Sequence, residues 1–144
     1  MIIGFSKPRK FNIFSWAIGK FTRAKFSHTF MCVYFPVINS HLVIEANRHG
    51  VNAISLNNWL EKNVMVESVV MNDQEVVDRA FKFAIENLHV KYSSLTIIAI
   101  ALGIRFKDGA RRMICSEFIA RALRMDVRNV DQINPKELLE RLKQ

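Results

Sequence analysis

The pattern of apolar and polar positions in the first third of the chain predicts a helix followed by a β-hairpin. Residues 11–26 repeat apolar side chains at helical spacing, with basic residues around the stripe formed by Phe11, Phe14, Ile18 and Phe21. We expect this helix to dock on the core of its own chain, with a membrane surface as the alternative. Residues 28–35 and 42–46 are rich in β-branched and aromatic types, so a hairpin is expected across the turn between them.

Alternation along this hairpin predicts which side chains share a face. His28 and Cys32 fall on one face of the first strand, and Val43 and Glu45 share a face of the second. If the residue numbers of paired positions in the two strands add up to an odd number, His28 and Glu45 point to the same face of the sheet. Cys32, inside an apolar run, is expected in the core.

The remainder of the chain is predicted to be mainly helical. A capping-box pattern at Asn72 and Glu75 opens a helix with a close helical period as far as Leu88. The other expected elements are a short helix at 56–61, a strand at 64–70, a helix at 115–125, and a C-terminal helix opened by Asn134, Pro135 and Glu137.

Length and composition indicate one globular domain over residues 1–144. Half of the residues are apolar, whereas the chain has 5 Gly and 3 Pro, which excludes a disordered or collagen-like chain. The only cysteines are Cys32 and Cys115, so no disulfide framework is expected. The N-terminus lacks signal-peptide features, and the apolar run 95–104 is too short to cross a bilayer. We therefore expect a protein that is cytoplasmic or delivered without a signal peptide.

The net charge of +8 is unevenly distributed. Six basic residues precede the first acidic residue, Glu45, and a second cluster comprises Arg105, Lys107, Arg111 and Arg112. Such patches attract an anionic polymer or a membrane surface, although solubility alone would also explain them. The sequence shows no nucleic-acid-reading motif, so nucleic acid is an unlikely partner.

Several familiar site types are excluded by inspection. The chain has no GxSxG, GxxxxGK[ST], GxGxxG or HExxH motif. Its four histidines are spread without metal-ligand spacing. We expect neither a metal nor a cofactor.

A thiol nucleophile is the chemistry that remains. Cys115 opens a predicted helix directly after Arg111 and Arg112, and both features favour a thiolate. A buried structural cysteine is the alternative, because Cys115 also belongs to an apolar stripe. His28 at the mouth of a strand is a candidate base, and Glu45 at the end of an apolar run is a candidate for orienting it. A surface histidine and an exposed edge-strand carboxylate are the corresponding alternatives.

With these residues in view, the chain resembles the circularly permuted branch of the NlpC-type thiol peptidase superfamily, which has a papain-like core. The resemblance lies in three blocks taken in order: FSHTFMCVYF, VIEANRHGVNAISLNNWL and ICSEFIARAL. His28 precedes Cys115, as in the permuted branch. A weaker likeness lies in Tyr92 and in INPKELL.

The resemblance implies an α+β fold in which a small antiparallel sheet packs against helices and the nucleophile lies at a helix N-terminus. It also implies that Cys115 is the nucleophile, His28 the base, Glu45 the orienting residue and Tyr92 a substrate contact. Members of the superfamily include peptidases of cell-wall peptides, amidases and lipid acyltransferases.

We therefore expect a cysteine hydrolase that cleaves a peptide amide through an acyl-enzyme, with cell-wall peptide as the first substrate expectation. A lipid acyl hydrolase or acyltransferase is one alternative. A non-catalytic module that binds through its basic faces is the other.

Overall fold

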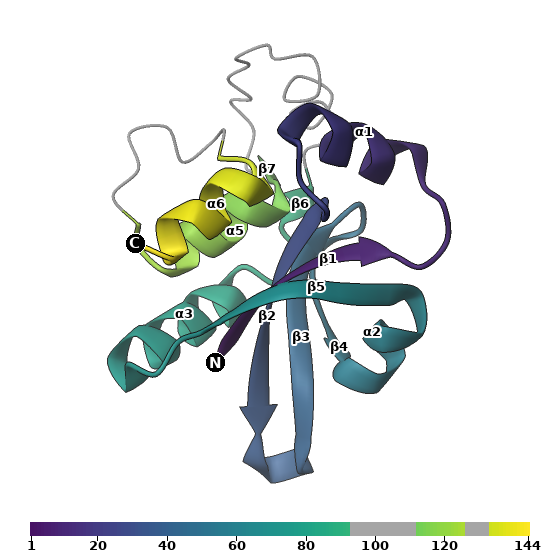
Figure 1. Cartoon of the computed structure of the whole chain (residues 1–144). Helices are drawn as coiled ribbons and strands as arrows, with labels where there is room; N and C mark the ends of the chain where they lie inside the picture. Colours follow the sequence, from purple (N-terminus) through teal and green to yellow (C-terminus); the bar gives the residue numbers. More distant parts are fainter. Residues whose placement is uncertain (93–111, 126–132) are drawn as a thin grey trace.

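The fold is built on one antiparallel sheet. The computed structural model describes residues 1–92, 112–125 and 133–144 (Figure 1). The five strands lie in the order β4-β3-β2-β1-β5, and a parallel pair, β6 and β7, is separate from them. Their bounds are β1 Ile2–Pro8, β2 His28–Phe35, β3 Ser40–Asn47, β4 Gly50–Ser55, β5 Asn63–Val70, β6 Lys91–Tyr92 and β7 Arg112–Met113.

Helices pack on both faces of this sheet, and the α+β class expected from the sequence is confirmed. On one face, α3, α5 and α6 share a core with Ile3, Met31 and Ile44 of the strands. On the other face, Trp59 of α2 packs with Phe30 and Val43. The helices are α1 Ile13–Thr22, α2 Leu56–Lys62, α3 Gln74–Glu86, α5 Cys115–Ala122 and α6 Pro135–Leu142, with a 3₁₀ turn at Pro36–Ile38.

The predicted hairpin is formed by β2 and β3, and the residue numbers of its paired positions add up to an odd number. Cys32 lies opposite Val43, and Met31 lies opposite Ile44. Cys32 is buried, as expected from the apolar run around it. This register directs His28 and Glu45 to the same face.

Two strands of the five-stranded sheet are absent from the sequence-based expectation, as is the short pair β6 and β7. β1 lies between β2 and β5 and is buried over residues 3–6, because helices cover both of its faces. A strand covered on both faces has no polar alternation, so its pattern gives no strand signal. β4 is short, and it follows β3 across a tight turn that ends at Gly50, whose positive φ of 101° suits glycine.

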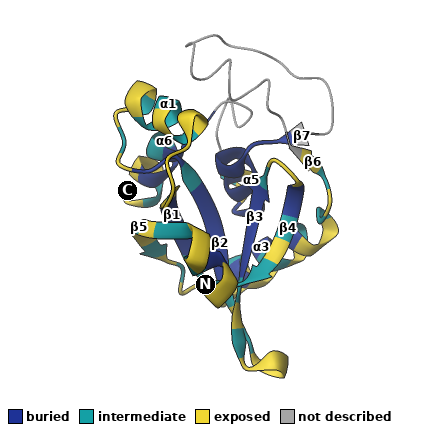
Figure 2. Ribbon diagram, turned by 90° about the vertical axis from the view of Figure 1, so that its right-hand side faces the viewer, coloured by how far each residue is buried: buried dark blue, intermediate teal, exposed yellow. Residues whose placement is uncertain are grey.

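The expectation that the helix of residues 11–26 docks on the core is wrong. α1 is shorter than predicted, and none of its residues is buried. Phe14 and Phe21 are each 60% exposed and Trp16 is 53% exposed. Figure 2 shows α1 mostly in the colours of exposed and intermediate residues, in contrast to α5.

The other helix predictions hold with small shifts in their bounds. Asp73, and not Asn72, is the N-cap of α3, because its side chain accepts from the N–H groups of Glu75 and Val76. Asn134 caps α6 as expected. The apolar run 95–104 lies outside the described residues. Within the described part of the chain, no helix has the length and apolar character needed to span a membrane.

Candidate active site

His28 occupies the first position of β2, where contacts with β1 fix its backbone. Ser6 lies opposite His28 in the ladder, and the Ser27 N–H donates to the Ser6 carbonyl over 3.0 Å. The His28 side chain is 19% exposed, so the imidazole keeps contact with solvent.

Glu45 lies on β3 and receives three hydrogen bonds. The Nε2 atom of His28 is 2.9 Å from Glu45 Oε2. Trp59 Nε1 donates to the same oxygen over 2.8 Å, and Asn47 Nδ2 donates to Oε1 over 2.7 Å. Glu45 is only 7% exposed, and a buried carboxylate is costly without such partners. The site is therefore arranged around an ionised Glu45.

The pKa of Glu45 reflects this arrangement. Burial acts to raise the pKa, but the hydrogen bond and charge of His28, together with the bonds from Trp59 and Asn47, lower it to about 2. Glu45 is thus a carboxylate at any pH at which the protein is expected to work. A permanent negative charge beside Nε2 favours an imidazolium at His28.

Cys115 is the first residue of α5 and is buried. Ile114 precedes it as N-cap and supplies no side-chain hydrogen bond, so Cys115 lies in the first turn, where the helix dipole favours negative charge. The charge and side chain of His28 and the backbone N–H groups of Thr29 and Ser116 act on the thiol in the direction that lowers its pKa. Since His28 Nε2 contacts Glu45, Nδ1 is the ring nitrogen that remains for Cys115.

Strands β2 and β3 are not paired in the part of the sheet nearest His28, on the side of Met31 and Ile44 where Cys115 lies. The ladder between β2 and β3 ends at Met31 and Ile44, and α5 contacts both strands. Beyond that pair, the backbone N–H of Thr29 is one of the groups that lower the pKa of Cys115. The opening therefore allows a helix terminus to reach residues on two neighbouring strands.

Charge governs the protonation of the Cys115 and His28 pair. Burial acts to raise the pKa of the Cys115 thiol, but the positive charge and hydrogen bond of His28 lower it below its usual range. Burial acts to lower the pKa of His28, but Cys115 and then Glu45 raise it to about 10. Both shifts act in the direction of a thiolate beside an imidazolium.

The helix that carries Cys115 is firmly held. Six consecutive residues from Cys115 to Ala120 are buried, which Figure 2 shows as dark blue along α5. The Ser116 hydroxyl donates to the Ile133 carbonyl just before α6, and Glu117 pairs with Arg121 over 2.7 Å. This packing fixes the position of the thiol relative to β2.

Two expected features near Cys115 fall partly or wholly outside the described residues. Tyr92 ends β6, where its backbone pairs with Met113, but its side chain is not among those described. Arg105, Lys107 and Arg111 lie outside the described residues, and only the backbone of Arg112 is described, in β7. The expected roles of Tyr92 and of this basic cluster remain predictions.

The sequence reasoning missed Trp59 and gave Asn47 no role as a partner of Glu45. Both are recognisable afterwards from chemistry, because a buried indole N–H needs an acceptor and a buried carboxylate needs donors.

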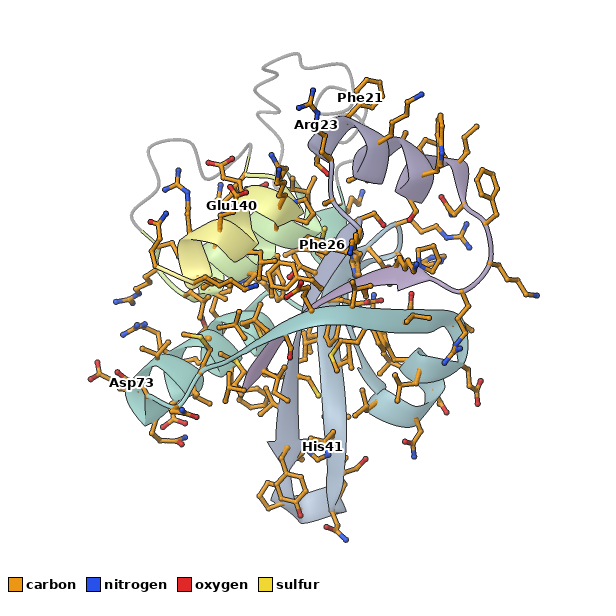
Figure 3. All side chains as sticks on the ribbon, in the orientation of Figure 1. Phe21, Arg23, Phe26, His41, Asp73 and Glu140 are labelled. Carbon is orange, nitrogen blue, oxygen red and sulfur yellow. The ribbon has the colours of Figure 1, made fainter. Side chains whose placement is uncertain are left out.

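His41 lies near the far end of the hairpin, opposite Tyr34 (Figure 3). Among the described residues, no cluster of His, Cys, Asp or Glu could hold a metal ion.

Comparison with known proteins shows which family the chain belongs to. The model of a family described as permuted papain-like amidase enzymes, the YaeF/YiiX or C92 family, matches residues 9–141. No curated protein matches the chain in sequence. The family match confirms the permuted papain-like class expected from the order of the histidine and cysteine blocks.

Proposed function

The chain belongs to the permuted papain-like amidase family, and from that premise we propose that it cleaves an amide bond of a peptide substrate with Cys115 as nucleophile, His28 as general base and acid, and Glu45 as the orienting residue. The observation that carries this proposal is the continuous set of contacts from Glu45 through His28 to Cys115. Papain-like amidases are hydrolases of this chemical class.

The first half of the reaction forms an acyl-enzyme. The Cys115 thiolate attacks the carbonyl carbon, and the negative charge that develops on the carbonyl oxygen is stabilised by backbone N–H groups at the start of α5. The His28 imidazolium then donates its proton to the leaving amine nitrogen, and the C–N bond breaks. Glu45 stabilises the imidazolium until that transfer.

The second half releases the acyl group. Neutral His28 takes a proton from water, the resulting hydroxide attacks the thioester carbon, and the bond to Cys115 breaks. His28 keeps the proton taken from water, so the departing thiolate restores the ion pair, and the product leaves as a carboxylic acid that loses its proton to solvent. No group beyond this chain and water is needed for the cycle.

Cell-wall peptide amides are the substrate class we propose first. A lipid acyl ester or amide is the second candidate, because α1 presents exposed aromatic and basic residues on the surface that leads into the strand of His28. Peptide and lipid substrates share the same acyl-enzyme step. Parallel assays with peptidyl amides and with acyl lipids would separate them.

Labelling with a thiol-reactive acylating probe tests the proposed nucleophile. We expect modification of Cys115 and not of Cys32, because burial raises the pKa of Cys32. Cys115→Ala should abolish both labelling and turnover, whereas Cys32→Ala, the matched control, should keep both. Equal labelling of the two thiols, or turnover by Cys115→Ala, would contradict the proposal.

A further inference from the structure

Helix α1 exposes most of its large apolar side chains to solvent, whereas a helix docked on the core would bury them. Apart from Ile18, the side that faces the body carries small or polar residues, and the Ser15 hydroxyl contacts the Ser27 hydroxyl at 2.5 Å. The opposite side carries most of the large apolar residues, namely Ile13, Phe14, Trp16 and Phe21, and Phe11 just before the helix is 81% exposed. Such a concentration of exposed aromatic residues marks an interaction surface.

Basic residues surround this aromatic surface. The Lys20 ammonium lies over the Trp16 ring, 4.8 Å from its centroid. Lys10, Arg23 and Lys25 are also exposed, and the chain has no acidic residue before Glu45. Aromatic residues flanked by lysine and arginine on one helix are typical of segments that lie in the interface of an anionic membrane.

A cavity of about 360 Å³ lies between α1 and the segment that leads into β2. Lys7, Lys20 and Lys25 line it together with Trp16, and none of its lining residues is acidic. An opening with three ammonium groups beside an aromatic ring suits the phosphate of a lipid headgroup. Ser27 also lines the cavity, so it ends one residue from His28.

We propose that α1 and the lysines around it dock this protein on the surface of an anionic membrane, with the aromatic residues in the interface and a lipid phosphate beside the lysines. The helix lies at the end of the molecule opposite the tip of the β2–β3 hairpin (Figure 1). Docking through α1 therefore brings the surface beside His28 to the lipid and leaves that tip in water. This inference does not depend on the proposed hydrolysis.

Vesicle binding tests this proposal with the whole chain. We would compare vesicles of phosphatidylcholine with vesicles of equal parts phosphatidylcholine and phosphatidylglycerol, by co-sedimentation at low and high salt. The fluorescence of Trp16 provides a second readout, because Trp59 is buried and should not respond. We expect binding to the anionic vesicles only, a blue shift of the emission, and loss of binding as salt rises.

Two variants separate the aromatic and the charged contributions. Phe14→Ser with Phe21→Ser should abolish binding with no change in the thermal midpoint, because both rings are exposed. Lys20→Gln with Lys25→Gln should weaken binding about 25-fold, since each basic charge near an anionic surface is worth roughly a fivefold change. Co-sedimentation is the readout for this second variant because Lys20 contacts the Trp16 ring.

Matched controls come from surfaces remote from α1. Val37→Ser with Ile38→Ser removes exposed apolar side chains from the hairpin tip, and Lys82→Gln removes an exposed charge from α3. Both should bind like the wild type. The proposal is overturned by equal binding to the two vesicle types, or by α1 variants that bind like the controls. It is also overturned if α1 variants instead abolish dimerisation in sedimentation velocity, because α1 would then contact a second copy.

Discussion

Trp59 donates its indole N–H to the same oxygen of Glu45 that contacts His28. The ring of Trp59 is also packed against Phe30, with 4.2 Å between ring centroids. Helix α2 therefore fixes the carboxylate from the face of the sheet opposite to α5, and α5 supplies the thiol. The site is assembled from two layers of the fold.

Replacing Trp59 should disturb the site through Glu45. In Trp59→Phe the carboxylate loses one donor, so the pKa of Glu45 should rise and the acid limb of the pH–rate profile should move to higher pH. We expect turnover to fall about tenfold and stability to fall by about 2 kcal/mol. Trp16→Phe on the exposed helix is the control. An unshifted acid limb would show that Trp59 has only a structural role.

Glu45→Gln tests the orienting residue directly. Loss of the negative charge should lower the pKa of His28 from about 10 and reduce kcat/KM roughly 100-fold or more. Glu67→Gln, at an exposed carboxylate paired with Lys143, is the matched control and should leave kcat/KM unchanged. Undiminished activity of Glu45→Gln would remove Glu45 from the mechanism. Asn47 would then be the next candidate, whereas His41 lies too far along the hairpin.

Stability at acid pH should also depend on Glu45. Its pKa in the folded protein is about 2, below the ordinary value of 4.5, so the unfolded state binds more protons between these two values. The stabilisation is therefore complete above about pH 5 and is lost as pH falls towards 2, by up to about 3 kcal/mol. Urea denaturation at several pH values should show a flatter acid dependence for Glu45→Gln. Parallel curves for the two proteins would refute this assignment.

Gly4 in β1 is expected to tolerate no side chain. A Cβ there would lie 2.2 Å from Cζ of Phe30, whose ring is held against Trp59. Gly4→Ala should therefore lower the free energy of unfolding by about 1–3 kcal/mol. Ser68→Ala, opposite Gly4 on β5 and exposed, is the control and should change stability little. Equal urea midpoints for the two variants would contradict the expected clash.

Local patterns in the sequence were sufficient for most elements, and they made the pairing of His28 with Glu45 depend on one unknown, the register of the hairpin. Alternation shows which side chains share a face within β2 and within β3. Only the register between the two strands decides whether His28 and Glu45 lie on the same face of the sheet. β1 was missed because burial on both faces removes the polar alternation that marks a strand. The N-cap shifted by one residue because Asn72 and Asp73 are both good caps and only geometry selects one.

The surroundings of an element were harder to predict than the element itself. The stripe of phenylalanines in α1 shows which residues share a face, but not whether a core or solvent lies opposite. Similarly, Trp59 lies 14 residues from Glu45, and only the fold of α2 on the sheet brings the indole to the carboxylate. Contacts between distant segments depend on tertiary packing, which no local pattern specifies.

The rate of alkylation of Cys115 as a function of pH tests the ion pair most directly. If His28 stabilises the thiolate, the wild type should react at a nearly constant rate through neutral pH and should slow only on acidification, because the pKa of Cys115 is lowered. In His28→Ala, burial is no longer opposed by that charge, so the rate should rise only at alkaline pH. A wild-type profile that titrates near the free-thiol value of about 8.5 and is unchanged by His28→Ala would contradict the account.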